Sequence, residues 1–370
     1  MSDIISTTPS TLSRMVKHCF DMKRPMMVWG PPGVGKSDLI EQIGEETGRQ
    51  VVDMRLILME PTDIKGIPYY DREKKTMEWS VSGELPTEGT NVGKCILFLD
   101  EINSAPQSVQ GAAYQLILNR RIGSHYKLPD ETVIVAAGNR MTDRGVTYQM
   151  PSPLANRFVH FTLEHNFDDW LDWALNNGIR QEVTGFLSAH KQHLFDFDPK
   201  RLSTEMAFAT PRTWAFASQL LTDRFLANEE DLILLLSGIV GQAKAIEFKA
   251  YQKLCIHMPK ALDVLNGKVK EINKDLDTSV HYSLVISICN ELVEQLKKVN
   301  KDNEKDVKKF DNYFKNFLNF ATSNFSDEMS VFSLRTLLMN YKLDYSPSSS
   351  TVTKAWKEFA AKYKDYLTFK

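Results

Sequence analysis

The sequence predicts an α/β protein in which helices cover both faces of a parallel β-sheet, followed by a helical region. Short apolar runs alternate with amphipathic helical patterns over residues 1–165. These runs are almost continuously apolar, which is typical of strands buried on both faces of a parallel sheet. From about Asn166 onward the periodicity is helical. Together these observations predict a doubly wound domain with a helical part behind it.

Five apolar runs are predicted to form the strands of the sheet, and helical patterns lie between them. The runs cover residues 25–30, 50–56, 95–100, 132–138 and 158–163. In a doubly wound sheet, ligands bind at the carboxyl ends of the strands. Polar residues that directly follow these runs are therefore the first candidates for a binding site.

Two segments outside the sheet are predicted to form hairpins. In residues 65–86, the alternating stretches IPYYD and TMEWSV flank DREKK, which suggests a small exposed hairpin. In residues 120–135, a second hairpin is predicted to turn near Leu128–Asp130. Neither is needed to complete the sheet, so both are candidate projections that contact another molecule.

The helical region is predicted to contain four clear helices and a less regular end. The helices are expected in residues 167–178, 180–190, 211–226 and 231–254. Residues 295–311 are highly charged, which fits either a solvated helix face or a linker. The tail from Asn312 onward is aromatic and helical, with an interruption at residues 346–351. We therefore expect a core at 1–165, a helical domain at 166–295 and an extension at 296–370.

Composition fits a globular cytoplasmic protein. Hydrophobic residues make up 42% and charged residues 25%, and the formal net charge of −2 gives no support for nucleic-acid binding. No run of about 18 apolar residues occurs, so we expect no transmembrane helix, and the N-terminus predicts no signal peptide. The four cysteines are far apart and are expected to be reduced thiols. They are Cys19, Cys95, Cys255 and Cys289.

The segment GPPGVGKS after the first predicted strand fits the phosphate-binding pattern G-x-x-x-x-G-K-[ST], with a helix predicted behind it. Glycines let the backbone wrap around phosphates, and the helix N-terminus adds a positive dipole end. Lys36 is expected to reach the β- and γ-phosphates, and Ser37 to ligate Mg²⁺. The residues expected to contact the nucleotide are Gly30, Pro31, Pro32, Gly33, Val34, Gly35, Lys36, Ser37, Asp38 and Asp100.

Two further strand ends carry the polar groups that such a site needs. The run CILFL ends in Asp100 and Glu101, where Asp100 is expected to hold Mg²⁺ and Glu101 to act as general base toward a water. The next run ends in Asn139, whose amide is expected to hold that water or the γ-phosphate. The alternatives are an ordinary strand that ends in acids and an Asn that begins a loop.

These residues, with PSPLANRF, resemble the AAA+ ATPase superfamily. The stretches LMEPTDIKG and ATPRTW make the MoxR-like branch the best match, over about residues 10–260. The resemblance implies an AAA+ P-loop core with a five-stranded parallel sheet, a helical lid and, here, a helical C-terminal extension. It also implies a hairpin inserted at the second core helix and another before the strand that ends in Asn139.

The resemblance also assigns roles to two arginines. Arg157 in PLANRF aligns with the arginine finger, which reaches the γ-phosphate of a neighbouring subunit, and Arg212 in ATPRTW aligns with the second sensor. The alternatives are a salt-bridged cation for Arg157 and an ordinary surface residue for Arg212. Arg140 and Arg144 are further candidates for a finger. No family role transfers to about residues 300–370.

The resemblance therefore implies an ATPase that uses ATP and Mg²⁺ in a homo-oligomeric ring, usually a hexamer. Such a ring would remodel, assemble or activate a protein client, commonly with a von Willebrand factor A-type partner. A nucleic-acid-dependent motor is the alternative, because the predicted hairpins contain some basic residues. A nucleotide-binding scaffold is less favoured, because Glu101 and Arg157 are both present. The pair His190 and His193 lacks an evident third metal ligand and is set aside.

Overall fold

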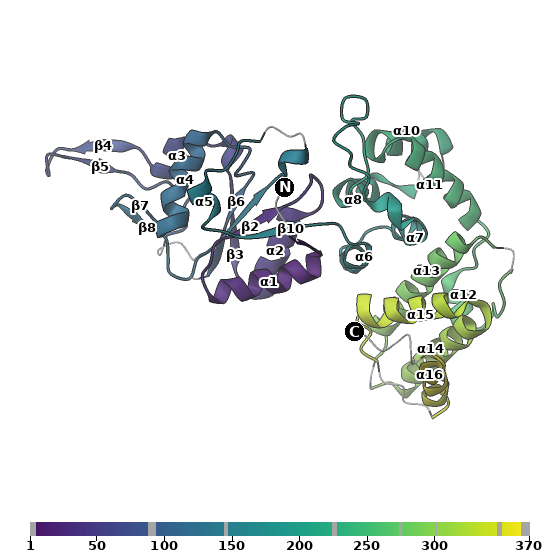
Figure 1. Ribbon diagram of the computed structural model, residues 1–370. Coiled ribbons are helices and arrows are strands. Elements are labelled where there is room, and N and C mark those ends of the chain that lie inside the picture. Colours follow the sequence, from purple (N-terminus) through teal and green to yellow (C-terminus); the bar gives the residue numbers. More distant parts are fainter. Residues whose placement is uncertain are drawn as a thin grey trace. The chain divides into compact units, whose positions relative to one another are not determined.

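The computed structural model describes residues 5–87, 94–143, 147–223, 228–273, 276–300, 302–345 and 350–363. Contacts between Cα atoms divide the chain into two compact units. We call Met1–Asn166 with Phe197–Thr204 the α/β unit, and Phe167–Asp196 with Glu205–Lys370 the helical unit. Figure 1 shows the parallel sheet in the first unit and the helices of the second.

The sheet of the α/β unit is fully parallel, as predicted, but has six strands in the described residues instead of five. The sixth, β1, is only two residues long and pairs Ser6 with Thr162 at the edge of the sheet. A two-residue strand held by backbone bonds shows no apolar pattern, so the sequence did not reveal it. The order is β1 (Ser6–Thr7), β10 (Val159–Leu163), β2 (Met26–Trp29), β9 (Val133–Gly138), β6 (Cys95–Asp100) and β3 (Gln50–Arg55).

The pairing register brings the carboxyl ends of the strands to one edge. Trp29 at the end of β2 lies opposite Gly138 at the end of β9. Asp100 at the end of β6 lies opposite Arg55 at the end of β3. The segments that follow β2, β6 and β9 therefore start side by side.

Helices cover both faces of the sheet. On one face, α1 (Pro9–Asp21) and α2 (Lys36–Thr47) pack against it (Figure 1). On the other, α3 (Pro61–Lys65) and α4 (Gln107–Asn119) share a core with alternate strand residues such as Leu97 and Leu99. Strand residues buried on both sides explain the continuous apolar runs. The short elements of this unit are η1 (Leu56–Leu58), η2 (Met141–Asp143) and α5 (Ser152–Ala155).

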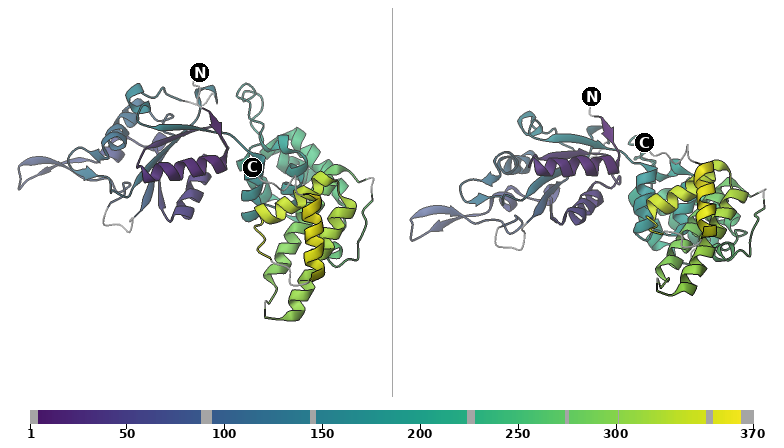
Figure 2. Two further views of the ribbon diagram at one scale, coloured as in Figure 1. Left: turned by 60° about the horizontal axis from the view of Figure 1, so that its bottom comes forward. Right: turned by 90° about the horizontal axis from the view of Figure 1, so that it is seen from below.

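Both hairpins are present. The first pairs β4 (Pro68–Asp71) with β5 (Thr76–Trp79) and projects beyond the other elements of its unit (Figures 1 and 2). The second pairs β7 (Arg121–Ile122) with β8 (Tyr126–Lys127).

The predicted turn of the second hairpin was wrong. The chain turns at Gly123, which has a φ of +54°, and not near Leu128–Asp130. Glycine adopts this left-handed conformation without steric cost. Leu128 is fully buried in the core of the α/β unit and is not part of an exposed turn.

The helical unit contains two apolar cores that meet at α13. The first surrounds Phe186 and Trp214, and the second surrounds Phe310 and Phe317. The helices are α6 (Phe167–Asn176), α7 (Gln181–Ala189), η3 (Lys191–Leu194), α8 (Pro211–Leu220), α10 (Glu229–Val240), α11 (Gln242–Cys255), α12 (Ala261–Leu265), α13 (Thr278–Lys297), α14 (Glu304–Asn324), α15 (Asp327–Arg335), the π-helical η4 (Thr336–Asn340) and α16 (Ser350–Lys362).

Two segments of the helical unit form other helices than the sequence pattern suggested. The apolar run 231–254 is two helices, because Gly241 has a φ of +93° and separates α10 from α11. The charged segment 295–311 contains the end of α13 and the start of α14. Among the described residues, no helix is both long and apolar enough to cross a membrane. The division at residues 165 and 295 stays a prediction.

Candidate nucleotide-binding site

The loop between β2 and α2 forms the centre of the candidate site. Gly35 caps α2 with a φ of +95° and has no side chain to bond the first N–H groups of the helix. These N–H groups and the helix dipole make an anion site at the start of α2. The ammonium of Lys36 donates to the carbonyl oxygens of Gly30 at 2.8 Å and Pro31 at 3.1 Å. The loop therefore holds a cation beside a row of backbone donors, which suits phosphate groups.

Ser37 and Asp100 form the part of the site that suits a metal ion. The hydroxyl of Ser37 donates to Oδ2 of Asp100 at 3.0 Å. Asp100 is 7% exposed, and its Oδ1 accepts the N–H of Glu101 at 2.8 Å. A hydroxyl and a carboxylate at this distance are hard oxygen ligands, so these two residues fit Mg²⁺.

Glu101 occupies a strained position at the end of β6. Its φ is +54°, a left-handed conformation that is uncommon for a residue with a side chain. The N–H of Ser104 donates to the carbonyl of Glu101 at 2.9 Å, and the N–H of Ile102 donates to that of Ala137 at 3.0 Å. The surrounding backbone thus maintains the strained turn, and such strain is concentrated at functional sites.

Asn139 connects the end of β9 to the phosphate-binding loop. Its Oδ1 accepts a hydrogen bond from Nζ of Lys36 at 3.0 Å. Its backbone is held by Asn103, a buried residue that the sequence analysis did not single out. The structure therefore brings the predicted residues Lys36, Ser37, Asp100 and Asn139 together by hydrogen bonds.

Arg55 is a second residue of this edge that the sequence analysis missed. It ends β3 opposite Asp100, and its Nε pairs with Asp53 at 3.3 Å. The hydrogen bond that Arg55 donates to Asp53 raises the pKa of Arg55, and the charges of Asp53, Asp100 and Glu101 add to the shift. A fixed positive charge therefore lies in the electrostatic field of the two acids that end β6.

Arg157 is exposed on the α/β unit, just after α5. Among the described residues, none forms an ion pair or hydrogen bond with its guanidinium, and its role as a finger stays a prediction. Two hydrogen bonds through His160 hold α5, the short helix that precedes Arg157. The indole N–H of Trp29 donates to Nδ1 of His160 at 2.9 Å, and Nε2 of His160 then donates to the carbonyl of Ala155 at 2.8 Å. These two hydrogen bonds connect the end of β2, the strand before the phosphate-binding loop, to α5.

The other predicted arginines differ from Arg157. Arg140 pairs with the buried carboxylate of Asp143 at 3.0 Å, so its guanidinium is engaged within its own loop. Arg144 lies outside the described residues. Arg212 is exposed at the start of α8, after Pro211 at the first helical position. It belongs to the helical unit, and its role as second sensor stays a prediction.

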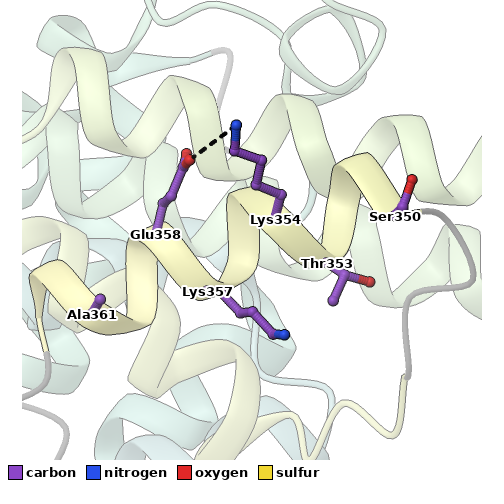
Figure 3. Close-up of a pocket in the computed structure, with 6 residues that line it drawn as sticks. All are labelled: Ser350, Thr353, Lys354, Lys357, Glu358 and Ala361. Carbon is purple, nitrogen blue, oxygen red and sulfur yellow. Dashed lines mark ion pairs between the residues drawn. The ribbon is translucent and has the colours of Figure 1, made fainter.

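A shallow depression lies on α16 (Figure 3). It is lined by Ser350, Thr353, Lys354, Lys357, Glu358 and Ala361, all from one helix. Lys354 pairs with Glu358 at 3.8 Å, and Lys357 points away from that pair (Figure 3). Polar groups from several elements do not converge there among the described residues, so we assign it no site.

Comparison with known families places the site in context. Residues 25–158 match the family model of the AAA domain (dynein-related subfamily). Midasin of Giardia intestinalis is 30% identical over 177 residues, which are 46% of this chain and 4% of that protein. The chaperone MoxR1 of Mycobacterium tuberculosis is 28% identical over 141 residues, 37% of this chain and 35% of that protein. The chain thus spans well under half the length of these curated relatives.

Solved structures resemble the chain only weakly. NtrX from Brucella abortus, in complex with ADP, has a TM-score of 0.38 at 13% identity, covering 78% of this chain and 65% of that one. The RuvB Holliday junction branch migration motor of Thermotoga maritima has a TM-score of 0.34 at 15% identity, covering 70% and 74%. TM-scores below 0.5 do not bear on function.

Proposed function

We propose that the chain, an AAA+ ATPase of the MoxR-like type, hydrolyses ATP in a homo-oligomeric, hexameric ring to remodel, assemble or activate a protein client. The observation that carries this proposal is the hydrogen-bonded group of Lys36, Ser37, Asp100 and Asn139 at one edge of the sheet. The ends of two strands, β6 and β9, and the start of α2 supply these residues. Phosphate, metal and water therefore have adjacent binding groups.

The proposed reaction assigns one task to each group. Lys36 and the N–H groups at the start of α2 bind the β- and γ-phosphates. Asn139 orients the water or the γ-phosphate without adding charge, and Glu101 accepts the proton of the attacking water. Ser37 and Asp100 would hold Mg²⁺, which supplies positive charge to the phosphates when bound.

Arg157 is the reason for proposing a ring. It is exposed and without a partner among the described residues, so it is available to a second copy. A guanidinium near the transferred phosphate neutralises transition-state charge and contributes about 10³- to 10⁵-fold to the rate. We infer that Arg157 of one copy completes the site of the next.

The client-binding surface is proposed on the β4–β5 hairpin. Its register places Pro68, Tyr70, Met77 and Trp79 on one face, and all four are exposed. Exposed apolar faces of this kind commonly mark sites of protein contact. A von Willebrand factor A-type partner, known for other MoxR-like proteins, belongs to this proposal.

A nucleic-acid motor remains the less favoured alternative. Two lysines of the hairpins already have partners: Lys74 pairs with Asp71 and Glu78, and Lys127 pairs with Asp130. Phosphate binding requires cations that release counterions, so paired lysines weaken this interpretation. ATP turnover that DNA or RNA stimulates at low salt would support the nucleic-acid motor instead.

The proposal is tested by replacing the general base. Glu101→Gln removes the proton acceptor but leaves the phosphate-binding loop unchanged. We expect this variant to bind ATP and to turn it over about 10²- to 10⁴-fold more slowly, measured by calorimetric binding and steady-state phosphate release. Glu131→Gln, an exposed acid away from the candidate site, is the control and should behave as wild type. Wild-type turnover in Glu101→Gln would contradict the role of Glu101.

A further inference from the structure

Asn103 is buried beside the candidate site and contacts it through two hydrogen bonds. It is 1% exposed. Its Nδ2 donates to the carbonyl of Asn139 at 2.7 Å, and its Oδ1 accepts the N–H of Asn139 at 3.2 Å. One carboxamide thus satisfies both backbone groups of Asn139. The side chain of Asn139 makes a different bond, to Lys36.

The carboxamide of Asn103 continues the sheet where the backbone cannot. β6 and β9 pair as far as Leu99 and Ala136. At Glu101 the chain leaves the strand direction, and the N–H of Ile102 makes one more bond, to Ala137. Asn103 then supplies to Asn139 the donor and the acceptor that a neighbouring strand would supply. Without it, two partly buried backbone groups would lose this partner.

The neighbouring residues are adapted to this contact. A Cβ on Gly138 would lie 2.3 Å from Oδ1 of Asn103, so only glycine leaves room for the carboxamide. The carbonyl of Asn103 accepts the N–H of Tyr148 at 2.6 Å. Tyr148 precedes α5, and Arg157 follows it. Asn103 therefore contacts both the end of β9 and the segment that leads to the proposed finger.

We propose that Asn103 is a positioning residue for ATP hydrolysis: it holds the backbone of Asn139 so that the Asn139 carboxamide stays directed at Lys36 and the γ-phosphate. The proposal rests on the proposed ATPase function. Asn103 does not contact substrate. It acts through Asn139, and its effect is therefore on the chemical step and not on nucleotide affinity.

The test compares Asn103→Ala, Asn139→Ala and the double variant in steady-state ATP turnover. Loss of positioning at a reacting centre costs up to about 100-fold in rate, so we expect Asn103→Ala to lower kcat by about 10- to 100-fold with KM for ATP little changed. If Asn103 acts through Asn139, the double variant is no slower than Asn139→Ala alone. An unchanged kcat in Asn103→Ala, or independent losses that multiply, would overturn the proposal.

Asn324→Ala is the matched control. Asn324 makes the same kind of bridge in the helical unit, accepting the N–H of Ile272 at 2.9 Å and donating to the carbonyl of Lys270 at 2.8 Å. A general loss of stability would appear in both variants, whereas a selective loss of kcat should appear only in Asn103→Ala. Equal losses of kcat in Asn103→Ala and Asn324→Ala would show that Asn103 has only a structural role.

Two further measurements keep the test decisive. If Asn103→Ala does not fold, Asn103→Asp has the same size and still accepts the N–H of Asn139. It loses the donor and places a carboxylate oxygen against the carbonyl of Asn139, so it should also lower kcat. If wild type shows no turnover with ATP and Mg²⁺, the proposed function fails. Hydrogen exchange then tests the positioning itself: the amide of Asn139 should exchange faster in the Asn103 variants, and an unchanged rate would refute the contact's importance.

Discussion

Gly138 shows at the scale of one residue how tightly the candidate site is packed. A Cβ there would meet Oδ1 of Asn103 at 2.3 Å and Cε of Met27 at 2.7 Å. We expect Gly138→Ala to lower the free energy of unfolding of the α/β unit by about 1–3 kcal/mol, the usual cost of overpacking. Urea unfolding followed by tryptophan fluorescence measures this change.

Gly111→Ala is the matched control for Gly138→Ala. Gly111 is exposed within α4, and a Cβ there meets nothing within 4 Å. Because alanine is the better helix former, this substitution should raise the free energy of unfolding by about 0.5–1 kcal/mol. If both substitutions shift stability in the same direction, the close approach at Gly138 has no energetic consequence.

At this scale the sequence predicted which residue types follow which strands, but not how they touch. Lys36, Asp100 and Asn139 stand in motifs whose spacing can be recognised, and their proposed roles stay predictions. Asn103 and His160 act through contacts between distant segments. Such contacts depend on strand register and side-chain reach, which no local pattern contains.

At the scale of elements, the five main strands and the two hairpins follow from apolar runs and alternation. The predictions of elements that were wrong or incomplete have local causes. β1 is too short to show a pattern, and Gly123 rather than the Pro129 region supplies the turn of the second hairpin. Gly241 divides one apolar run into α10 and α11 because its φ of +93° ends the helix. A positive φ at a glycine is visible only in the structure.

The packing of α7 and α13 predicts a dependence of stability on pH. Burial lowers the pKa of His190 and of His281 below the usual value, and for His190 the charge of His193 adds to the shift while Glu247 and Asp277 oppose it. The unfolded chain, with a histidine pKa of about 6.5, therefore binds protons before the folded one does. Stability is full above about pH 6.5 and declines as the pH falls toward the lower folded pKa values.

Calorimetric unfolding between pH 8 and pH 5 should therefore show a Tm that is constant at first and then falls below about pH 6.5. His190→Gln removes one of the titrating groups and should make this fall shallower. His18→Gln, which alters an exposed histidine on α1, should leave it unchanged. A Tm that rises on acidification, or an identical slope in all three proteins, would contradict the assignment.

At the scale of the whole molecule, the sequence predicted an α/β part followed by helices, and the structure confirms it. The helical unit has a second core around Phe310 and Phe317, for which the resemblance offered no role. The family match ends at residue 158 and does not reach that core.

Mixing two slow variants tests the central claim, that one copy completes the ATP site of another. Arg157→Ala keeps its own site but lacks the finger, and Glu101→Gln lacks the base but keeps the finger. Each alone should bind ATP and turn it over slowly. In mixed oligomers, an intact Glu101 in one copy meets an intact Arg157 from the next, so phosphate release should rise well above the sum of the separate rates. A mixture no faster than that sum would contradict the shared site.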